Sequence, residues 1–375
     1  MLERPVCQVC GKNELLISRH LGICYNCILE NSSPAVEIAK QVHIAARRPF
    51  GLPEVAPHNP DGLKCGLCVN DCVIGESETG YCGLVVNREN KLVRLAGTPE
   101  KGLLDWYYDP NPTNCVAWIC PAYGLGYPKY AYCDGPEYEY SNLAVFYGAC
   151  GFDCLFCQNA HYREMPRQLT PLLSAKDLID KVHKRVSCIC YFGGDPGPQI
   201  LHSLAVSEYA EHLAKKGGRP LRICWETNGS ANWPLLEKAV QFALKSGGNI
   251  KLDLKTFHNP LNIALCGVSN HQTLANFKRI AQFSEDRPEI PLLFASTLLI
   301  PGYIDENEVH CIAKFIAEIN PNIPYSLLGF YPHFMLNDLP TTSKAHAERC
   351  LKVAKAEGLM KIKIGNVHLL SNINY

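Results

Sequence analysis

Three cysteines on one short loop constrain this chain more than any other feature. Cys150, Cys154 and Cys157 follow the apolar run 143–147, which is typical of a buried strand. Thiolates at these offsets can converge on one 4Fe–4S cluster, because cysteine is the usual ligand of such clusters. Three ligands for four irons leave one iron open, as in catalytic metal sites that keep a free position. We therefore predict a catalytic cluster here, with a zinc knuckle or three buried thiols as the alternatives.

The sequence around these cysteines resembles the radical SAM superfamily, whose cluster binds S-adenosylmethionine (SAM) through the open iron and cleaves it reductively. The tail Cys157-Gln158-Asn159 is similar to the branch around pyruvate formate-lyase activating enzymes and AmmeMemoRadiSam-type proteins. The likeness covers roughly residues 140–370 and continues more weakly upstream to about residue 60. It implies a 4Fe–4S cluster and SAM as cofactors, and a reducing electron donor such as a ferredoxin or flavodoxin as a partner.

The chain holds 20 cysteines among its 375 residues. A disulfide scaffold would normally be short and secreted, and residues 1–5 lack the apolar segment of a signal peptide. Cysteines spaced C-x2-C therefore indicate metal ligands in a reducing cytoplasm. The 36 basic and 36 acidic residues balance, so nucleic acid is not indicated as a partner. No apolar run is long enough to predict a membrane span.

Residues 1–30 carry two C-x2-C pairs, which resemble a zinc ribbon. A segment this short cannot bury a core of its own, so it needs a metal to fold alone. We predict a zinc-ribbon-like module, with an iron site or a redox dithiol as alternatives, and a helix over 35–46 within a connecting region, 31–60. The ligands would be Cys7, Cys10, Cys24 and Cys27.

A cysteine- and tyrosine-rich accessory region, 61–140, precedes the main domain. Its first four cysteines resemble the upstream module of AmmeMemoRadiSam-type proteins, and they predict either zinc or a second iron–sulfur cluster, because both bind four thiolates. These four are Cys65, Cys68, Cys72 and Cys82. Residues 104–140 show little periodicity. We expect a packing collar over the barrel mouth or, alternatively, a lid whose cysteines bind a second cluster: Cys115, Cys120 and Cys133.

Downstream of the cysteine loop, short apolar runs alternate with stretches of helical periodicity such as 233–245 and 306–319. This alternation predicts an α/β fold with a parallel sheet and helices outside it. Six principal strands fall short of the eight that close a full barrel. We therefore predict an incomplete (β/α)6 TIM-like barrel over 141–375, open on one side. The expected strands are 143–147, 187–193, 221–227, 249–255, 291–300 and 325–331, with 361–365 as an accessory strand.

The expected carboxyl ends of these strands carry the residues that would bind SAM. Gly193, Gly194, Asp195 and Pro196 are similar to the family's GGEP-like motif, with Asp in place of Glu. Glycines let the backbone approach a ligand closely. The resemblance implies that this turn binds the amino group of the methionine moiety.

Later strand ends complete the expected pocket. The resemblance implies that Glu226, Asn228 and Asp253 lie near the carboxylate and ribose of SAM, with a cation site there. Lys255 is the expected partner of the SAM carboxylate. Thr297 and Ile300 would flank the adenine. The alternative is that these residues form ordinary strand-end ion pairs. Further cysteines fall within apolar periods and are predicted to be core residues: Cys188, Cys190, Cys224, Cys311 and Cys350, with Cys266 undecided.

Taken together, the motifs predict a cytoplasmic radical SAM enzyme. Its closest resemblance suggests an activating-enzyme-like oxidoreductase that acts on a protein or peptide, although a small-molecule substrate stays open. A cobalamin-dependent radical SAM methyltransferase is the first alternative. A non-catalytic metal-binding docking protein is the second, and the polar strand ends argue against it.

Overall fold

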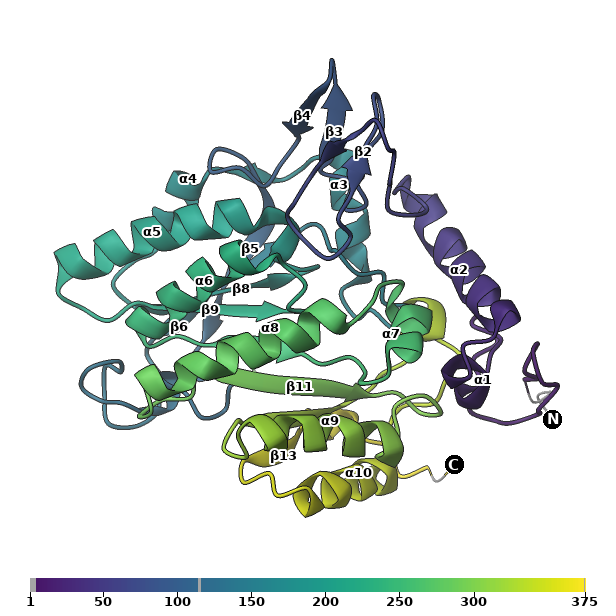
Figure 1. Cartoon of the computed structure of the whole chain (residues 1–375). Helices are drawn as coiled ribbons and strands as arrows, with labels where there is room; N and C mark the ends of the chain where they lie inside the picture. The colour runs from purple at the N-terminus through teal and green to yellow at the C-terminus, as the bar shows by residue number, and fades with distance from the viewer. Residues whose placement is uncertain (1–4, 114–115, 374) are drawn as a thin grey trace.

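The computed structural model describes residues 5–113, 116–373 and 375, and its centre is one large twisted sheet (Figure 1). From edge to edge, the strand order is β13-β12-β11-β10-β9-β8-β6-β5-β7. The bounds of these strands are β5 Gly102–Pro110, β6 Ser141–Tyr147, β7 Leu172–Leu173, β8 Val186–Gly193, β9 Arg222–Thr227, β10 Ile250–Asp253, β11 Leu293–Leu299, β12 Tyr325–Gly329 and β13 Ile362–Gly365.

From β6 through β13, every neighbouring pair of strands in this sheet is parallel. The predicted α/β fold with a mostly parallel sheet is therefore confirmed, and each expected strand is present. β13 pairs along its whole length with β12 and so is a full member of the sheet. β5 extends the sheet in the opposite direction, with Leu104 opposite Tyr147 and Pro110 opposite Ser141.

Residues 104–140, for which we noted little periodicity, begin with most of the strand β5, which pairs with β6 in the large sheet. Its sequence GLLDWYYDP alternates side chains between the two faces of the sheet, and Tyr107 and Asp109 share one face. Pro110 and Pro112 stand at or beyond the end of the strand. Proline is tolerated there because no further ladder hydrogen bond is needed.

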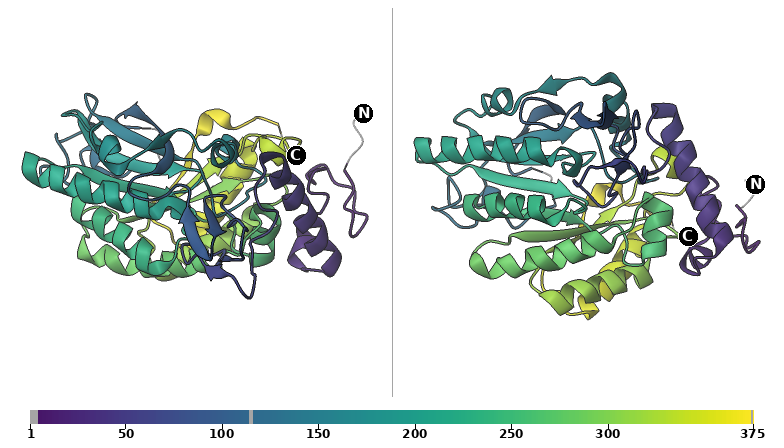
Figure 2. Two further views of the ribbon diagram at one scale, coloured as in Figure 1. Left: turned by 90° about the horizontal axis from the view of Figure 1, so that it is seen from above. Right: turned by 45° about the horizontal axis from the view of Figure 1, so that its top comes forward.

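Helices connect successive parallel strands and cover the sheet (Figures 1 and 2). Helix α6 shows why they form: Pro234 lies in its first turn, and Gly247 with φ +80° ends it. Its buried residues, Leu236, Ala239, Val240 and Ala243, repeat at the spacing of one helix face. The helices that follow the cysteine loop are α3 Met165–Gln168, α4 Ala175–Ile179, α5 Ile200–Gly217, α6 Trp233–Ser246, α7 Asn259–Cys266, α8 His271–Gln282, α9 Glu306–Ile319 and α10 Lys344–Ala356.

The N-terminal residues stand at one edge of the molecule, where both views of Figure 2 show their helices. The helices are α1 Tyr25–Leu29 and α2 Ser33–Arg47, and α2 confirms the helix predicted over 35–46. Tyr303 of the main domain ties this part down: its hydroxyl accepts from the backbone N–H of Ser18 at 3.1 Å and donates to the carbonyl of Ile23 at 3.0 Å. Leu21 and Ile23 are buried in the same core as the sheet.

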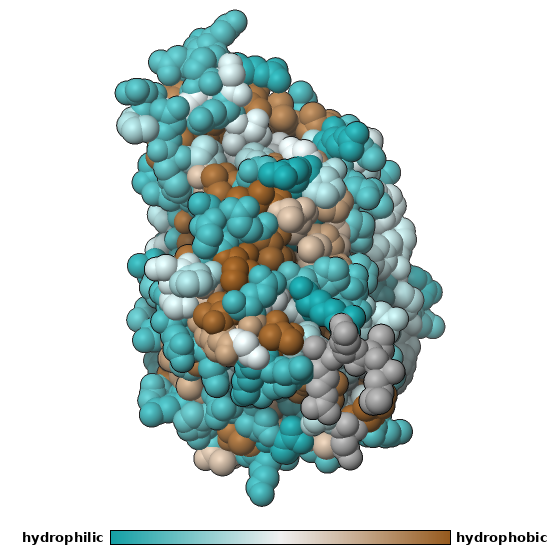
Figure 3. All heavy atoms as spheres, turned by 90° about the vertical axis from the view of Figure 1, so that its right-hand side faces the viewer, coloured by the Kyte–Doolittle hydropathy of each residue, from teal (hydrophilic) through white to brown (hydrophobic). Residues whose placement is uncertain are grey.

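Along the chain, two short hairpins follow helix α2 and precede the first strand of the large sheet. They consist of β1 Leu63–Lys64 with β2 Val73–Ile74, and β3 Val85–Arg88 with β4 Lys91–Arg94. Figure 3 shows the side of the molecule that is on the right in Figure 1, where apolar residues form a broken strip among hydrophilic ones. Among the described residues, no helix is both long and apolar enough to cross a membrane.

Residues 116–140 pack against the amino-terminal ends of the parallel strands. The Glu137 carboxylate is buried and lies 2.5 Å from the guanidinium of Arg222, the first residue of β9. The hydroxyl of Tyr132 donates to the carbonyl of Pro220 at 2.6 Å, directly before the same strand. The segment therefore closes the end of the sheet opposite the carboxyl ends of the strands. Our prediction of a collar over the barrel mouth was wrong in its location.

Candidate active site

The three motif cysteines lie on the loop that follows β6, at the carboxyl end of the sheet. Cys150 and Cys154 are buried and Cys157 is half-buried, and all three line one cavity of about 180 Å³. The carboxyl end of α7 holds this loop: the backbone N–H of Asp153 donates to the carbonyl of Cys266 at 2.8 Å. We call residues 148–159 the cluster loop.

The charges around the motif thiols bear on whether they can hold a metal cluster. Burial raises the pKa of Cys150 and Cys157, so neither thiol ionises readily without a metal. A hydrogen bond with Cys266 and burial raise the pKa of Cys154, whereas the cations Lys255 and Arg163 oppose that rise. Since a cluster binds thiolates, the two cations suit an anionic group at this position.

A buried ion cluster beneath the cluster loop was not predicted from the sequence. The carboxylate of Asp153 lies 2.9 Å from Arg163 and 2.9 Å from Nδ1 of His43, which comes from α2. Burial alone would raise the pKa of Asp153, but the bond from His43 and the charge of Arg163 lower it to about 2. These ion pairs thus link the middle of the cysteine motif to helix α2. No local pattern links His43 to Asp153, because 110 residues separate them.

Gly193, the last residue of β8, and Gly194 pack directly on the backbone of the cluster loop. The N–H of Gly194 donates to the carbonyl of Tyr147 at 2.9 Å, and the N–H of Asp195 donates to that of Ala149 at 2.7 Å. A Cβ on Gly194 would stand 2.3 Å from the carbonyl oxygen of Ala149. Gly193 has φ +115°, a conformation that favours glycine. Both positions therefore need glycine for the turn to reach the loop.

The carboxylate of Asp195 joins the ends of β8 and β9. It accepts hydrogen bonds from the hydroxyl of Thr227 at 2.7 Å, from the N–H of Asn228 at 2.8 Å and from the N–H of Gly197 at 2.7 Å. Burial raises its pKa to about 6, although these three bonds oppose the rise. Asp195, Thr227 and Asn228 all line the cavity, whereas Pro196 is not among its lining residues.

The polar residues at the ends of β9 and β10 form ion pairs. Lys255 lies 2.7 Å from the carboxylate of Asp253, and both line the cavity. Lys255 therefore has a protein partner, as in the ion-pair alternative that we gave for the strand ends, and it also lines the cavity. Burial would lower the pKa of Lys255, but Asp253 and the thiol of Cys154 raise it above its usual value. Glu226 lines the cavity and pairs with Lys251 at 2.5 Å.

The predicted adenine contacts need a correction at β11. Thr297 is buried, and its hydroxyl donates to the carbonyl of Leu254 and accepts from Tyr325, so it points away from the cavity. Ile300 is also buried and is not a lining residue. Ser296 and Leu298 line the cavity instead. Because side chains alternate along a strand, a one-residue shift moves a prediction to the wrong face.

With this geometry established, comparison with known proteins identifies the domain. Residues 144–313 match the family model of the radical SAM superfamily. The chain carries a radical SAM domain.

An uncharacterised protein of Methanocaldococcus jannaschii is 25% identical to this chain over 333 residues, covering 81% of each chain. The pyruvate formate-lyase 1-activating enzyme of Escherichia coli is 24% identical over 211 residues, covering 52% of this chain and 77% of the enzyme. Among solved structures, a domain of the pyruvate-formate lyase-activating enzyme from Bacteroides vulgatus gives a TM-score of 0.37 at 22% identity, covering 47% of this chain and 98% of that domain. SuiB of Streptococcus suis bound to S-adenosylmethionine gives 0.41 at 15% identity, covering 59% and 49% of the two chains.

A second cavity lies deeper in the radical SAM domain, toward the amino ends of the strands. It has a volume of about 300 Å³ and shares Phe192 and Glu226 with the first cavity. Three cysteines that we predicted to be core residues line it, namely Cys188, Cys190 and Cys224, together with Cys120. Their alternation on β8 and β9 places them on the inner face of the sheet. Cys133 is not a lining residue of this cavity, and the prediction for Cys115 lies outside the described residues.

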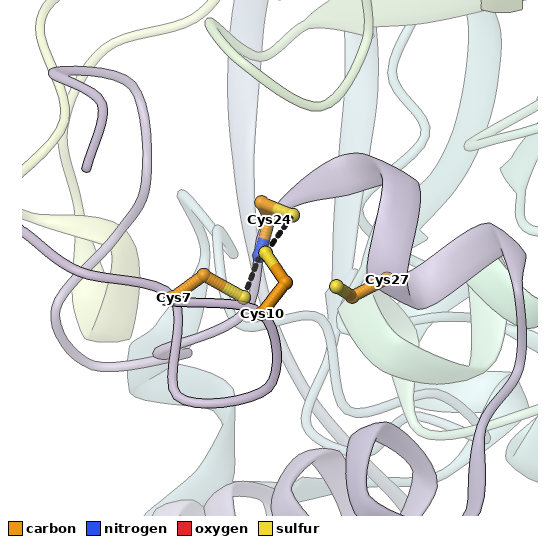
Figure 4. Close-up of side chains that lie close together, drawn as sticks. All are labelled: Cys7, Cys10, Cys24 and Cys27. Atoms are coloured by element: carbon orange, nitrogen blue, oxygen red, sulfur yellow. Dashed lines mark hydrogen bonds between the residues drawn. The ribbon is translucent and has the colours of Figure 1, made fainter. Parts of the chain in front are cut away.

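The N-terminal cysteines come together as predicted (Figure 4). The sulfurs of Cys7, Cys10, Cys24 and Cys27 all lie within 4.8 Å of one another, and those of Cys10 and Cys24 are 3.8 Å apart. Burial alone would raise the pKa of Cys7, but backbone N–H groups of Cys10 and Cys24 lower it to about 6. Four thiols at this spacing fit one tetrahedral ion, for which sulfurs stand about 3.8 Å apart at a metal–sulfur distance of about 2.3 Å.

Glu306, His346 and Cys350 also lie within 4.8 Å of one another, but they do not form a comparable metal site. Both ring nitrogens of His346 have protein partners, at the hydroxyl of Tyr375 and the carbonyl of Ile304. Glu306 pairs with Arg349. A metal ion would have to break these bonds to bind.

The four cysteines of the accessory region, which we call the hairpin cysteines, lie next to the cluster loop. They are Cys65, Cys68, Cys72 and Cys82, and they surround the β1–β2 hairpin. Within the described part of the chain, no three of their sulfurs lie within 4.8 Å of one another. This arrangement therefore differs from the compact N-terminal set.

Proposed function

We propose that this chain is a radical SAM enzyme that cleaves SAM reductively and abstracts a hydrogen atom from a protein or peptide substrate. One observation carries the proposal: the three motif cysteines share a cavity with the polar carboxyl ends of β8, β9 and β10. Active sites of barrel-like α/β enzymes lie at this end of the strands. The similarity to activating enzymes supports a macromolecular substrate.

Cys150, Cys154 and Cys157 would hold the cluster, and the donor set fits, because three thiols face one cavity beside two cations. When bound, a 4Fe–4S cluster and SAM supply a one-electron cleavage that yields a hydrogen-abstracting radical. The chain itself orients the ligand, balances charge and excludes water. Arg163 is fully buried and provides part of that balance.

The amino and carboxylate groups of SAM would have partners of suitable chemistry in the cavity. The backbone of Gly193 and Gly194 approaches closely enough to offer carbonyl acceptors to an ammonium group. Lys255 would bind the SAM carboxylate: its ammonium has three donors, and the bond to Asp253 uses one of them. Asp253 would keep Lys255 charged and aimed into the cavity. The side chains of Glu226 and Asn228 complete the polar wall.

The remaining assignments extend from this core. We propose that the N-terminal module (1–30) binds structural zinc and that 31–60 and 61–140 are connecting and accessory regions, the latter adding β5 to the sheet. Residues 141–375 would form the rest of the catalytic domain. Reductive cleavage needs a low-potential one-electron donor of the ferredoxin or flavodoxin kind. Such chemistry is suited to a reducing cytoplasm.

Anaerobic reconstitution tests the proposal. The protein is loaded with iron and sulfide, reduced and mixed with SAM, and 5′-deoxyadenosine is measured. We expect this product from the wild type and none from Cys154→Ala, whereas Cys311→Ala on α9 should match the wild type. Formation of S-adenosylhomocysteine and a methylated acceptor would favour a methyltransferase instead. Product formation by Cys154→Ala would contradict the assignment.

A further inference from the structure

The hairpin cysteines are arranged around one tight turn. The N–H of Cys65 donates to the carbonyl of Cys72 at 2.9 Å, closing the hairpin, and the N–H of Asp71 donates to the carbonyl of Cys68 at 3.0 Å. Asp71 has φ +42°, which lets the chain reverse between the two cysteines. Cys82 reaches the same region after the buried Tyr81. Three of the four cysteines, Cys65, Cys68 and Cys72, thus lie on the turn that joins β1 to β2.

This hairpin is docked on the radical SAM domain at the cluster loop. The side-chain amide of Asn70 donates to the carbonyl of Gly151 at 2.6 Å, next to the motif residue Cys150. The N–H of Val69 donates to the carbonyl of Ser230 at 2.9 Å. The sulfur of Cys68 lies 3.7 Å from the position that a Cβ on Gly151 would occupy. The hairpin, including Cys68, therefore packs directly against the cluster loop.

Backbone contacts hold the hairpin cysteines near one another. The N–H of Tyr81, the residue before Cys82, points to the sulfur of Cys72, and Cys72 pairs through its backbone with Cys65.

The distances between the ligand sulfurs differ between a zinc site and a 4Fe–4S cluster. Four thiolates on one zinc ion stand about 3.8 Å apart, as the tetrahedral geometry requires. Ligands of a 4Fe–4S cluster bind different irons and therefore stand farther apart. The N-terminal cysteines gather within 4.8 Å, whereas neither the hairpin cysteines nor the motif cysteines do so in groups of three among the described residues. The hairpin cysteines thus resemble the motif cysteines, and not the N-terminal set, in lacking the close spacing of a zinc site.

We propose that the hairpin cysteines bind a second 4Fe–4S cluster, positioned against the cluster loop, and not a structural zinc ion. The surroundings suit its charge. The N–H of Tyr81 points to the sulfur of Cys72 at 3.4 Å, and the guanidinium of Arg94 lies 4.0 Å from that of Cys65. Donors to sulfur stabilise the cluster and tune its potential. The nearby Asp71 is exposed and is neutralised by Lys64 at 3.0 Å.

The test removes the motif cluster so that only the hairpin site can hold iron. After anaerobic reconstitution, a variant with Cys150→Ala, Cys154→Ala and Cys157→Ala should retain about four irons and four sulfides per chain. Its reduced form should give an electron paramagnetic resonance signal that SAM does not change. Adding Cys68→Ala and Cys72→Ala to this variant should remove both iron and signal, whereas adding Cys311→Ala should not.

The wild-type protein gives a second measurement that needs no substitution. We expect about eight irons per chain and two reduced cluster signals, of which SAM alters one. About four irons together with two zinc ions per chain would overturn the inference. That result would leave SAM cleavage intact, so failure of this inference is distinguishable from failure of the proposed function.

Discussion

At the residue scale, Lys255 separates a SAM pocket from an ordinary ion pair. Replacing it with methionine in Lys255→Met removes the cation that would bind the SAM carboxylate and leaves Asp253, 2.7 Å away, to repel that carboxylate. A charge-assisted hydrogen bond contributes roughly 1.5–3 kcal/mol. We therefore expect SAM binding to weaken by about ten- to a hundredfold, measured by titration of the cluster-loaded protein.

The exposed Lys352 on α10 is the matched control, and Lys352→Met should bind SAM as the wild type does. The optical spectrum of the cluster should change little in either variant, because neither lysine is a ligand. Equal dissociation constants for Lys255→Met and the wild type would mean that the Lys255–Asp253 pair has only a structural role.

At the element scale, the turn after β8 depends on its contact with the cluster loop. In Gly194→Ala, the added Cβ would meet the carbonyl oxygen of Ala149 at 2.3 Å, and backbone cannot move away as a flexible side chain can. Overpacking of this kind costs about 1–3 kcal/mol. We expect a lower thermal midpoint and reduced iron content, because the loop that carries the motif cysteines must shift.

Gly217→Ala at the end of α5 is the matched control for this substitution. Its Cβ would meet only the side chain of Arg219, at 3.6 Å, and the helical position favours alanine. Iron content should stay at the wild-type level in this variant. Full cluster loading in Gly194→Ala would show that the turn tolerates a displacement of the loop.

The contact between β6 and α5 depends on pH through His202. Its Nδ1 accepts from the hydroxyl of Tyr147 at 2.8 Å, and its Nε2–H donates to the carbonyl of Leu173 at 3.1 Å. Burial lowers its pKa from 6.5 to about 4. Between those values the unfolded chain binds the proton more tightly, so stability is lost as pH falls through this window. This pKa shift corresponds to a loss of about 3 kcal/mol in the free energy of unfolding once the pH is below both pKa values.

Thermal unfolding measured from pH 7 to pH 4 checks this prediction. The thermal midpoint of His202→Gln should fall less steeply than that of the wild type, whereas that of His212→Gln, an exposed residue on the same helix, should follow the wild type. Protonation of Asp195, whose pKa is raised to about 6, increases the stability of the fold as pH falls through this window. The contribution of His202 is therefore taken from the difference between the variants and not from the wild-type curve alone. Parallel curves for His202→Gln and the wild type would contradict the prediction.

At the scale of the whole molecule, patterns carried by neighbouring residues were predictable and long-range contacts were not. The alternation of strands and helices and the motif cysteines follow from local spacing. The strand β5 was not predicted because its sequence, GLLDWYYDP, has no regular alternation of apolar and polar residues. The bond between His43 and Asp153 joins elements 110 residues apart, so no local signal reveals it. Thr297 was a strand-face error of one residue, since Ser296 and Leu298 face the cavity.

The N-terminal cysteines give the last prediction, because their module shares a core with the radical SAM domain. Leu21 and Ile23 are buried in that common core. The hydroxyl of Tyr303 forms hydrogen bonds with the backbone of Ser18 and of Ile23, the residue directly before Cys24. A metal that fixes Cys24 therefore also fixes these contacts. Metal analysis of the full chain should give about one zinc that Cys24→Ala removes.

Loss of this zinc should lower the thermal midpoint and accelerate hydrogen exchange in residues 5–30 and around Tyr303, since structural zinc binding contributes directly to folding. Cys350→Ala is the control: this cysteine lies near Glu306 and His346, whose hydrogen bonds and ion pair leave no ligand set for a metal, so zinc content should stay the same. A zinc content that is unaffected by Cys24→Ala would exclude the N-terminal cysteines as its ligands. Exchange confined to residues 5–30 would instead show that the module is not coupled to the barrel core.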